Sequence, residues 1–344
     1  MKRFGLAALL LWAVAAPAAH AAGSLEEVEV FTLSWVGDIA FSSDEGLPSG
    51  GVGGALGPVK GALRADVVTG NLEGTLTSGG SSKCGGASGG DCYAFRAPPS
   101  YSGGFRRVGF DVMNMANNHA HDFGDASLAE TARALRGAGI VPVGVGSSIS
   151  TLRVGRAKLA FVGFSSYPWS ASLLDLGAAQ RLVRAATAQA DLVVVMFHGG
   201  AEGADRTHVP FGTETAFGEN RGNLRAFSHA VIDAGAGLVL GSGPHVIRGI
   251  ERYRDRLIAY SLGNFAGPNT LGSSGVTGLS AVLRLRLTDD GDVLGGRWIP
   301  IVMPGGLPRF DPSYRSVALM RSLTYSDFKR RFPITSTGKI LPAG

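Results

Sequence analysis

The sequence is poor in cysteine, has no long run of one charge and, after its first residues, has no long apolar run. Its two cysteines, Cys84 and Cys92, lack a second pair or a flanking histidine, which argues against a cysteine-based metal site. The formal net charge of +5 includes no long basic run, so nothing indicates a nucleic-acid partner. No segment beyond the N-terminal residues reaches the ~18 unbroken apolar residues of a membrane-spanning helix.

The first residues have the pattern of an export signal. Lys2 and Arg3 give a positive start, residues 4–16 are apolar, and Ala19-His20-Ala21 places small residues where a signal peptidase cleaves. We therefore expect residues 1–21 to be a signal peptide and the mature chain to be a soluble periplasmic or extracellular protein. Residues 22–344 contain no linker that would separate a second domain, and we expect them to form one domain.

Glycine is abundant, with 52 residues, and many of them lie in two segments, 46–57 and 79–90. Neither segment repeats with a fixed period, which excludes a fibrous protein, and both are predicted to be loops. Cys84 and Cys92 belong to the Gly/Ser-rich loop 77–93. In an oxidising compartment a disulfide between them is the favoured interpretation, and a metal-binding pair is the alternative.

Apolar runs alternate with amphipathic segments along most of the chain, which predicts a layered α/β domain. Two runs, 279–287 and 293–302, flank an aspartate-rich turn and predict a hairpin with one solvated face, at a sheet edge. Strands are expected at 28–36, 65–70, 110–115, 140–145, 157–164, 191–197, 237–240 and 256–261. Helices are expected at 58–65, 99–108, 125–137, 177–190, 223–234 and 314–331.

Five of the apolar runs end at a polar residue that could bind a metal or exchange a proton. In open α/β sheets the ligand site lies beyond the carboxyl ends of the strands, so these residues are expected to converge on one edge. Such oxygen and imidazole ligands indicate a divalent metal centre (Mn, Zn or Fe) of one or two ions, as in phosphoesterases. The run ends are Asp38, Asn71 with Glu73, Asn118 with His119, His198 and His245.

Two of these run ends allow more specific roles. Side chains alternate in an extended segment, which places Asn71 and Glu73 on the same face. After the third run, the oxygen of Asn118 could bind a metal while His119 protonates a leaving group. Asp122 could accept a hydrogen bond from His119 and fix its tautomer. Taken singly, an aspartate or asparagine after a strand could instead cap a turn.

Four further residues are candidates for binding substrate. Arg221 and Arg248 carry guanidinium groups that fit a carboxylate or a phosphate, although a surface arginine is the commoner case. Glu202 follows His198 closely and could orient it. Asn264 could face the same site or simply fix a turn.

In order over residues 28–266, these blocks resemble the CapA family of capsule and poly-gamma-glutamate synthesis proteins, which looks like a branch of the calcineurin-like metallophosphoesterases. The resemblance implies a four-layer αββα sandwich, with His119 as the proton donor. It also implies metal ligands at Asp38, Glu73 or Asn71, Asn118, His198 and His245. The matching blocks include Gly37-Asp38, Asn71-Leu72-Glu73, Ala116-Asn117-Asn118-His119, His198-Gly199, Gly241–His245 and Tyr260–Phe265.

Two positions depart from that family pattern. Ala40 stands where a histidine usually follows the first aspartate, and Gly243 stands where many members have the first histidine of His-Pro-His. The nearby hydroxyl of Ser242 is a poorer ligand than imidazole.

Two main functions are therefore in competition. One is a metal-dependent hydrolase acting on a phosphoester or on the amide of an anionic polymer, and the other is a non-catalytic factor that binds or guides such a polymer. A generic phosphatase or nucleotidase is a weaker third interpretation. A membrane synthesis or export complex is a possible partner.

Overall fold

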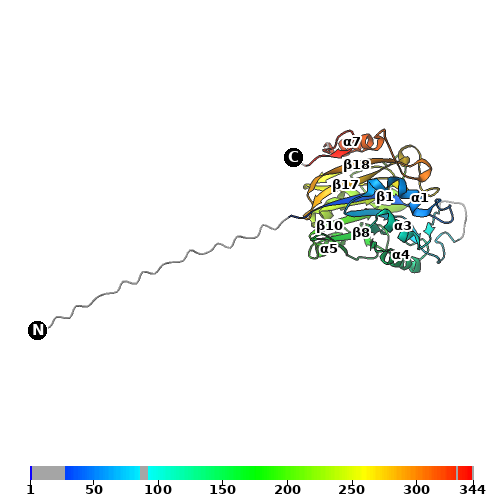
Figure 1. The fold of residues 1–344 in the computed structure, drawn as a ribbon, viewed down its shortest axis with the longest axis horizontal. Coiled ribbons are helices and arrows are strands. Elements are labelled where there is room, and N and C mark those ends of the chain that lie inside the picture. The colour runs from blue at the N-terminus through cyan, green and yellow to red at the C-terminus, as the bar shows by residue number, and fades with distance from the viewer. Residues whose placement is uncertain (2–27, 86–91, 331, 343–344) are drawn as a thin grey trace.

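Two β-sheets pack face to face, with helices on both outer surfaces (Figure 1). The computed structural model describes residues 1, 28–85, 92–330 and 332–342. The predicted signal peptide, apart from Met1, lies outside these residues. Within them, no helix combines the length and apolar character needed to cross a bilayer.

The first sheet has the strand order β19-β18-β17-β1-β2-β5-β6, and β16 and β20 pair with β1 and β18. Central strand β1 is parallel to β2 and β16 and antiparallel to β17. Its strands are β1 (Val30–Ile39), β2 (Val67–Leu72), β5 (Val112–Asn114), β6 (Val141–Val143), β16 (Asn264–Ala266), β17 (Leu279–Thr288), β18 (Val293–Val302), β19 (Arg309–Phe310) and β20 (Lys339–Ile340).

The second sheet has the order β14-β15-β13-β10-β8-β7, and β9 pairs with β8. The strands β8, β10, β13 and β15 run parallel, and the two outermost strands are antiparallel to their neighbours. They are β7 (Ser150–Val154), β8 (Ala157–Ser165), β9 (Ala171–Ser172), β10 (Leu192–His198), β13 (Leu238–Ser242), β14 (Ile250–Tyr253) and β15 (Arg256–Ala259). Two small ribbons pair β3 (Thr75–Leu76) with β4 (Arg96–Ala97) and β11 (Glu214–Ala216) with β12 (Glu219–Gly222).

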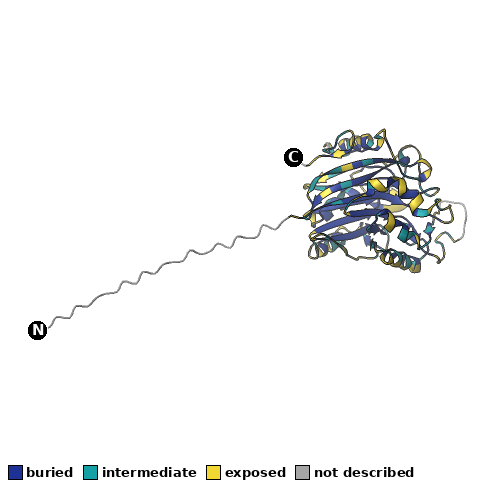
Figure 2. Cartoon of the chain, in the orientation of Figure 1, coloured by how far each residue is buried: buried dark blue, intermediate teal, exposed yellow. Residues whose placement is uncertain are grey.

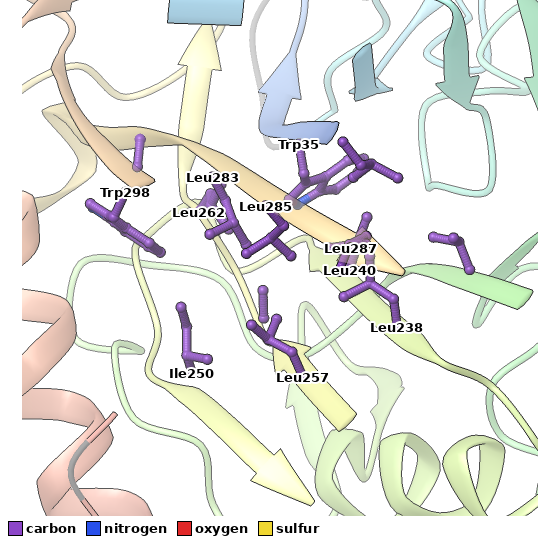
Figure 3. Close-up of a cluster of buried hydrophobic side chains, with 14 of the residues drawn as sticks. Trp35, Leu238, Leu240, Ile250, Leu257, Leu262, Leu283, Leu285, Leu287 and Trp298 are labelled. Carbon is purple, nitrogen blue, oxygen red and sulfur yellow. The ribbon is translucent and has the colours of Figure 1, made fainter. Parts of the chain in front are cut away.

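The main core fills the space between the two sheets. Alternate residues of β17, such as Leu283 and Leu285, point into it together with Trp35 of β1. Leu238 and Leu240 of β13 meet them from the second sheet, as Figure 3 shows. Buried residues accordingly run through both sheets, and exposed ones gather on the outer elements (Figure 2).

Helices cover the outer faces of both sheets. The helices α1 (Gly51–Leu56), α2 (Lys60–Leu63), α3 (Tyr101–Val108) and α4 (Asp125–Gly137) pack on the first sheet, and α5 (Leu176–Thr187) and α6 (Leu224–Asp233) pack on the second. The helix α7 (Arg315–Phe328) lies against β14, β17 and β18 and contributes Val317 and Met320 to the core between the sheets. The predicted four-layer αββα sandwich is confirmed.

One glycine-rich segment departs from the sequence-based expectation. The segment 46–57 was expected to be a loop, yet it contains α1, because Val52, Ala55 and Leu56 form a buried helical face. The neighbouring helix α3 has a glycine at the contact: a Cβ on Gly104 would lie 2.8 Å from the Cβ of Val52. Glycine therefore allows two short helices to approach closely at this point.

A half-buried polar group joins β14 to α6 and to Tyr260, the residue after β15. The carboxylate of Glu251 accepts hydrogen bonds from the ring of His229 at 2.9 Å and from the hydroxyl of Tyr260 at 2.7 Å. Burial raises the pKa of Glu251, but the hydrogen bonds from His229 and Tyr260 outweigh it, so that the pKa lies below its usual 4.5.

We expect Glu251→Gln to lower the free energy of unfolding at neutral pH by about 1 to 3 kcal/mol. Because the folded-state pKa is depressed, this contribution is present above pH 4.5 and is lost as the pH falls through the folded value. Denaturant unfolding of both proteins at neutral pH and near pH 3 measures it, with exposed Asp205→Asn as the control. A difference that persists unchanged at acid pH would contradict this assignment.

Candidate metal centre

The strand register brings the predicted ligands to one edge of the sandwich. Asp38 at the end of β1 is in register with Asn71 of β2 on one side and with Asn264 of β16 on the other. In the second sheet, His198 ends β10 in register with Ser242 of β13. The two sheets therefore present their carboxyl ends to the same place.

Three of these side chains form a compact, fully buried group. One ligand atom from each of Asp38, Glu73 and His198 lies within 4.8 Å of the others. His245 closes the group, because its Nδ1 is 3.2 Å from Oδ2 of Asp38 and its Nε2 is 3.5 Å from Oε1 of Glu73. His245 adopts φ 59°, a left-handed conformation that is uncommon outside glycine and frequent at functional sites.

Several atoms of the predicted ligands are buried without a hydrogen-bond partner in the described part of the chain. They are Oδ2 of Asp38, both carboxylate oxygens of Glu73, Oδ1 of Asn118 and Nε2 of His198. Buried polar atoms are nearly always paired, and an unpaired one costs about 1–3 kcal/mol. A divalent cation would satisfy carboxylate, amide and imidazole donors together, so the residues present fit a metal ion.

Asn71 is bound to its neighbours instead of being free to hold a metal. Its Nδ2 donates to Oδ1 of Asp38 at 2.8 Å, and its Oδ1 accepts from Asn114 at 3.0 Å and Asn117 at 3.1 Å. The resemblance left Glu73 and Asn71 open as alternatives. In the structure neither oxygen of Glu73 accepts a hydrogen bond, although the rings of His245 and His198 lie 3.5 and 3.7 Å from its Oε1, whereas Asn71 holds Asp38. Sequence reasoning missed Asn114, and the available signal was an amide ending an otherwise apolar strand.

Protonation in this group follows burial and charge. Burial raises the pKa of Glu73 well above its usual value and lowers the pKa of His198 well below its own. Burial also lowers the pKa of His245, but the carboxylates of Glu73 and Asp38 outweigh it and raise the pKa to about 10. The neutral imidazole of His198 is ready to bind a metal, whereas His245 must first give up a proton.

His119 is held in one orientation beside this group. Its Nδ1 is 2.7 Å from Oδ2 of Asp122, and the ring stacks on Phe95 with centroids 4.3 Å apart. The other oxygen of Asp122 binds Lys83 at 2.7 Å. Burial lowers the pKa of His119 although Asp122 acts in the opposite direction. With Nδ1 engaged, Nε2 is the nitrogen available for proton exchange.

A cavity of about 630 Å³ opens above these residues and is lined by Asn118, His119 and His245 among others. Lys83 and Arg221 bring positive charge to its wall, and Tyr93 and Phe217 are exposed at 60% and 78%. The cavity therefore combines polar groups, side chains of both charges, including Glu202 and Glu219, and accessible rings, which is typical of a site for a polar organic ligand.

The predicted substrate-binding residues take different places. Arg221 and Glu202 line the cavity and pair with each other at 2.7 Å, and Asn264 lines it too, 2.8 Å from Nδ1 of His245. Arg248 does not line it, because its guanidinium binds both carboxylate oxygens of buried Glu214, at 2.9 and 2.6 Å. The structure therefore gives Arg248 a structural ion pair in place of the predicted contact with substrate.

A disulfide joins Cys84 and Cys92, with Cα atoms 5.7 Å apart. Cys92 and Lys83, the residue before the other cysteine, both line the cavity. Lys83, next to this crosslink, contacts Asp122 through its side chain at 2.7 Å and through its backbone N at 2.8 Å.

Comparison with known proteins identifies the family. The family described as "Bacterial capsule synthesis protein PGA_cap" matches residues 32–269. This chain belongs to the PGA_cap family. It is 29% identical over 180 residues to the "Capsule biosynthesis protein CapA" of Bacillus anthracis, a match that covers 46% of this chain and 41% of the relative. It is 30% identical over 175 residues to the "PGA biosynthesis protein CapA" of Bacillus subtilis, covering 46% and 43%.

The matched segment thus spans less than half of these relatives. Among solved structures, the chain is similar to a 5'-nucleotidase precursor from Thermus thermophilus, with a TM-score of 0.43 and 14% identity. That similarity covers 87% of this chain and 59% of the other. The predicted membership of the CapA family of capsule synthesis proteins is confirmed by the family match.

The structure shows the surroundings of Ala40 and Gly243, the two positions where this PGA_cap chain lacks the histidine that the family pattern leads one to expect. Ala40 is fully buried and offers no ligand. Gly243 has φ +115°, and a Cβ there would lie 2.7 Å from both the backbone N and O of Gly199. Ser242 is not free to replace the missing imidazole, because its Oγ donates to the carbonyl of Phe197 at 3.1 Å and contacts Nδ1 of His198 at 3.2 Å.

Proposed function

We propose that the chain is an exported, metal-dependent hydrolase of capsule or poly-gamma-glutamate-type polymer metabolism, which cleaves a phosphoester or an amide of an anionic polymer. The observation that carries this proposal is the set of buried, unpartnered ligand atoms on Glu73, Asn118 and His198, directly below a cavity that His119 lines. The names of its relatives support the polymer, and the N-terminal pattern supports export to the periplasm or the cell exterior.

The ion would be held by Asp38, Glu73, Asn118, His198 and His245. Because Ala40 and Gly243 supply no side-chain ligand, this donor set favours one ion over two. A bound divalent ion supplies Lewis acidity and lowers the pKa of water.

The residues of the chain supply the other parts of the reaction. Asp122 and Phe95 fix the ring of His119, so that in its protonated form the ring can deliver the Nε2 proton to the leaving group as the P–O or C–N bond breaks. The hydroxyl of a water molecule adds to phosphorus or carbon, and the remaining proton of that water restores the proton on Nε2. Lys83 and Arg221 lie on the cavity wall, each already paired with a carboxylate, so they would hold an anionic group of the substrate by adding it to those ion pairs.

Metal removal tests the proposal. The purified mature protein is expected to contain about one equivalent of Mn, Zn or Fe by elemental analysis and to hydrolyse bis-p-nitrophenyl phosphate or poly-gamma-glutamate. Chelation should abolish turnover, and adding back one of these metals should restore it, with magnesium as a control for weaker, oxygen-only binding. A metal-free preparation with full turnover would exclude the proposal.

A non-catalytic function is the second candidate, because Ala40 and the conformation of Gly243 reduce the ligand set. Under this alternative the same cavity would bind or guide an anionic polymer without cleaving it. Absence of turnover with every metal tested, in protein that has taken up the metal and binds the polymer, would favour this function over hydrolysis.

A further inference from the structure

A basic groove lies on the outer face of the first sheet, far from the metal centre. It has a volume of about 420 Å³, and Arg284, Arg286, Arg297 and Lys339 contribute to its lining. Thr32 of β1 also lines it, six residues before Asp38. At ~3.3 Å per residue this separation is about 20 Å along the strand, so the groove is at the opposite end of the sheet from the predicted ligands.

The cations form a row across neighbouring strands. Arg284 of β17 is directly opposite Arg297 of β18, and Arg297 is directly opposite Lys339 of β20. Like charges that face each other across a sheet are destabilising. The pKa of Arg284 is lowered by partial burial and by the charge of Arg297, which reflects this crowding. The repulsion between these facing cations lowers the stability of the fold, and a bound anion would remove that repulsion.

These charges are not neutralised within the described part of the chain. Arg284 donates only to the backbone carbonyl of Arg64, at 3.1 Å, and none of the four cations forms an ion pair with a described acidic residue. The acidic group beside the groove is Asp66, whose carboxylate accepts hydrogen bonds from the backbone N and Oγ1 of Thr32. No acidic side chain lines the groove itself among these residues.

The shape of the groove suits an extended chain. Its floor includes Gly295 and Gly296, which lack side chains, and a Cβ on Gly296 would lie 2.2 Å from the carbonyl oxygen of Arg284. Adjacent strands are about 4.8 Å apart, so the row from β17 to β20 spans about 10 Å. A polymer with a carboxylate on each repeat can meet several of these cations at once.

We propose that this groove is a second binding site, for an extended polycarboxylate chain, that works independently of the metal centre. The choice of a polycarboxylate as the occupant rests on the proposed function. The charge and shape of the groove are observations that do not depend on that function. The site would retain an anionic polymer on the protein. It would do so whether or not another part of the same polymer occupies the cavity.

The test is binding of fluorescent poly-glutamate to the full-length mature protein in the presence of a chelator, at low and high salt. We expect Arg284→Gln/Arg297→Gln to weaken binding by at least about tenfold at low salt and to reduce its salt dependence. The melting temperature should stay equal or rise, because repulsion is relieved. Loss of binding with unchanged or higher stability cannot come from unfolding.

A matched control is Arg181→Gln/Arg184→Gln, which removes two exposed arginines from α5 on the other side of the molecule. Equal binding by both double variants would overturn the proposal. So would a groove variant that loses binding to phosphatidylserine vesicles but not to the polymer, since the face would then bind membranes.

His198→Ala should keep groove binding. If it abolishes all polymer binding, the polymer binds only at the metal centre, and the groove is not a site.

Discussion

Glu73→Gln and His198→Ala are each expected to remove metal binding almost completely. Both residues present buried atoms that no described protein group satisfies, and both lie in the Asp38–Glu73–His198 group. Substituting a group that only hydrogen-bonds to a ligand costs ~10–100-fold in metal affinity, so loss of a ligand should cost more. Isothermal titration with Mn²⁺ or Zn²⁺ measures this loss without relying on turnover.

Thermal unfolding separates this effect from damage to the fold. Metal at 100 times its dissociation constant should stabilise the wild-type protein by about 2.7 kcal/mol, and neither variant should respond. Without metal, Glu73→Gln should be at least as stable as the wild type, because it removes a carboxylate that is costly to ionise where it is buried. Ser280→Ala, at a buried serine outside the group, is the control. A wild-type response to metal that is retained in both variants would contradict the assignment.

His119→Ala is expected to lower the turnover number by about 10²–10⁴-fold while leaving the metal content unchanged. The ring lines the cavity, and its Nδ1 is held by Asp122, so the substitution removes proton transfer without removing a ligand. Single-turnover kinetics with a substrate whose leaving group is a poor base should show a smaller loss, because such a group needs less protonation.

His121→Ala is the matched control for this prediction. His121 lies two residues further on, pairs with Asp125 at 2.8 Å and stacks on Trp169. Its removal should leave turnover within a few-fold of wild type. If both histidine variants lose activity equally, or if His119→Ala loses its metal, His119 does not have the role of proton donor.

The layered fold could be predicted from sequence because its signals are local. The strand β10 is a continuous apolar run that ends at His198, and the helical spacing of apolar residues in α4 is plain. The convergence of distant run ends followed from the rule that parallel strands present their carboxyl ends together. The order of the four layers was not predicted from local signals and came from the family resemblance.

What could not be predicted depends on contacts between distant residues. Nothing local distinguishes Arg221, whose guanidinium lines the cavity, from Arg248, which is committed to Glu214. Asn71 and Asp38 are adjacent in register, and only the network through Asn114 shows that the amide is already used. The helix α1 was missed because glycine suppresses helical propensity, and burial against α3 overrides that preference.

The backbone at Gly243 also limits how this centre can change. A histidine introduced there would have to displace the chain at Gly199 and abandon a conformation that L-residues rarely adopt. Gly243→His alone is therefore expected to disturb the backbone at Gly199 and not to add a ligand, unless the loops after β10 and β13 are changed together.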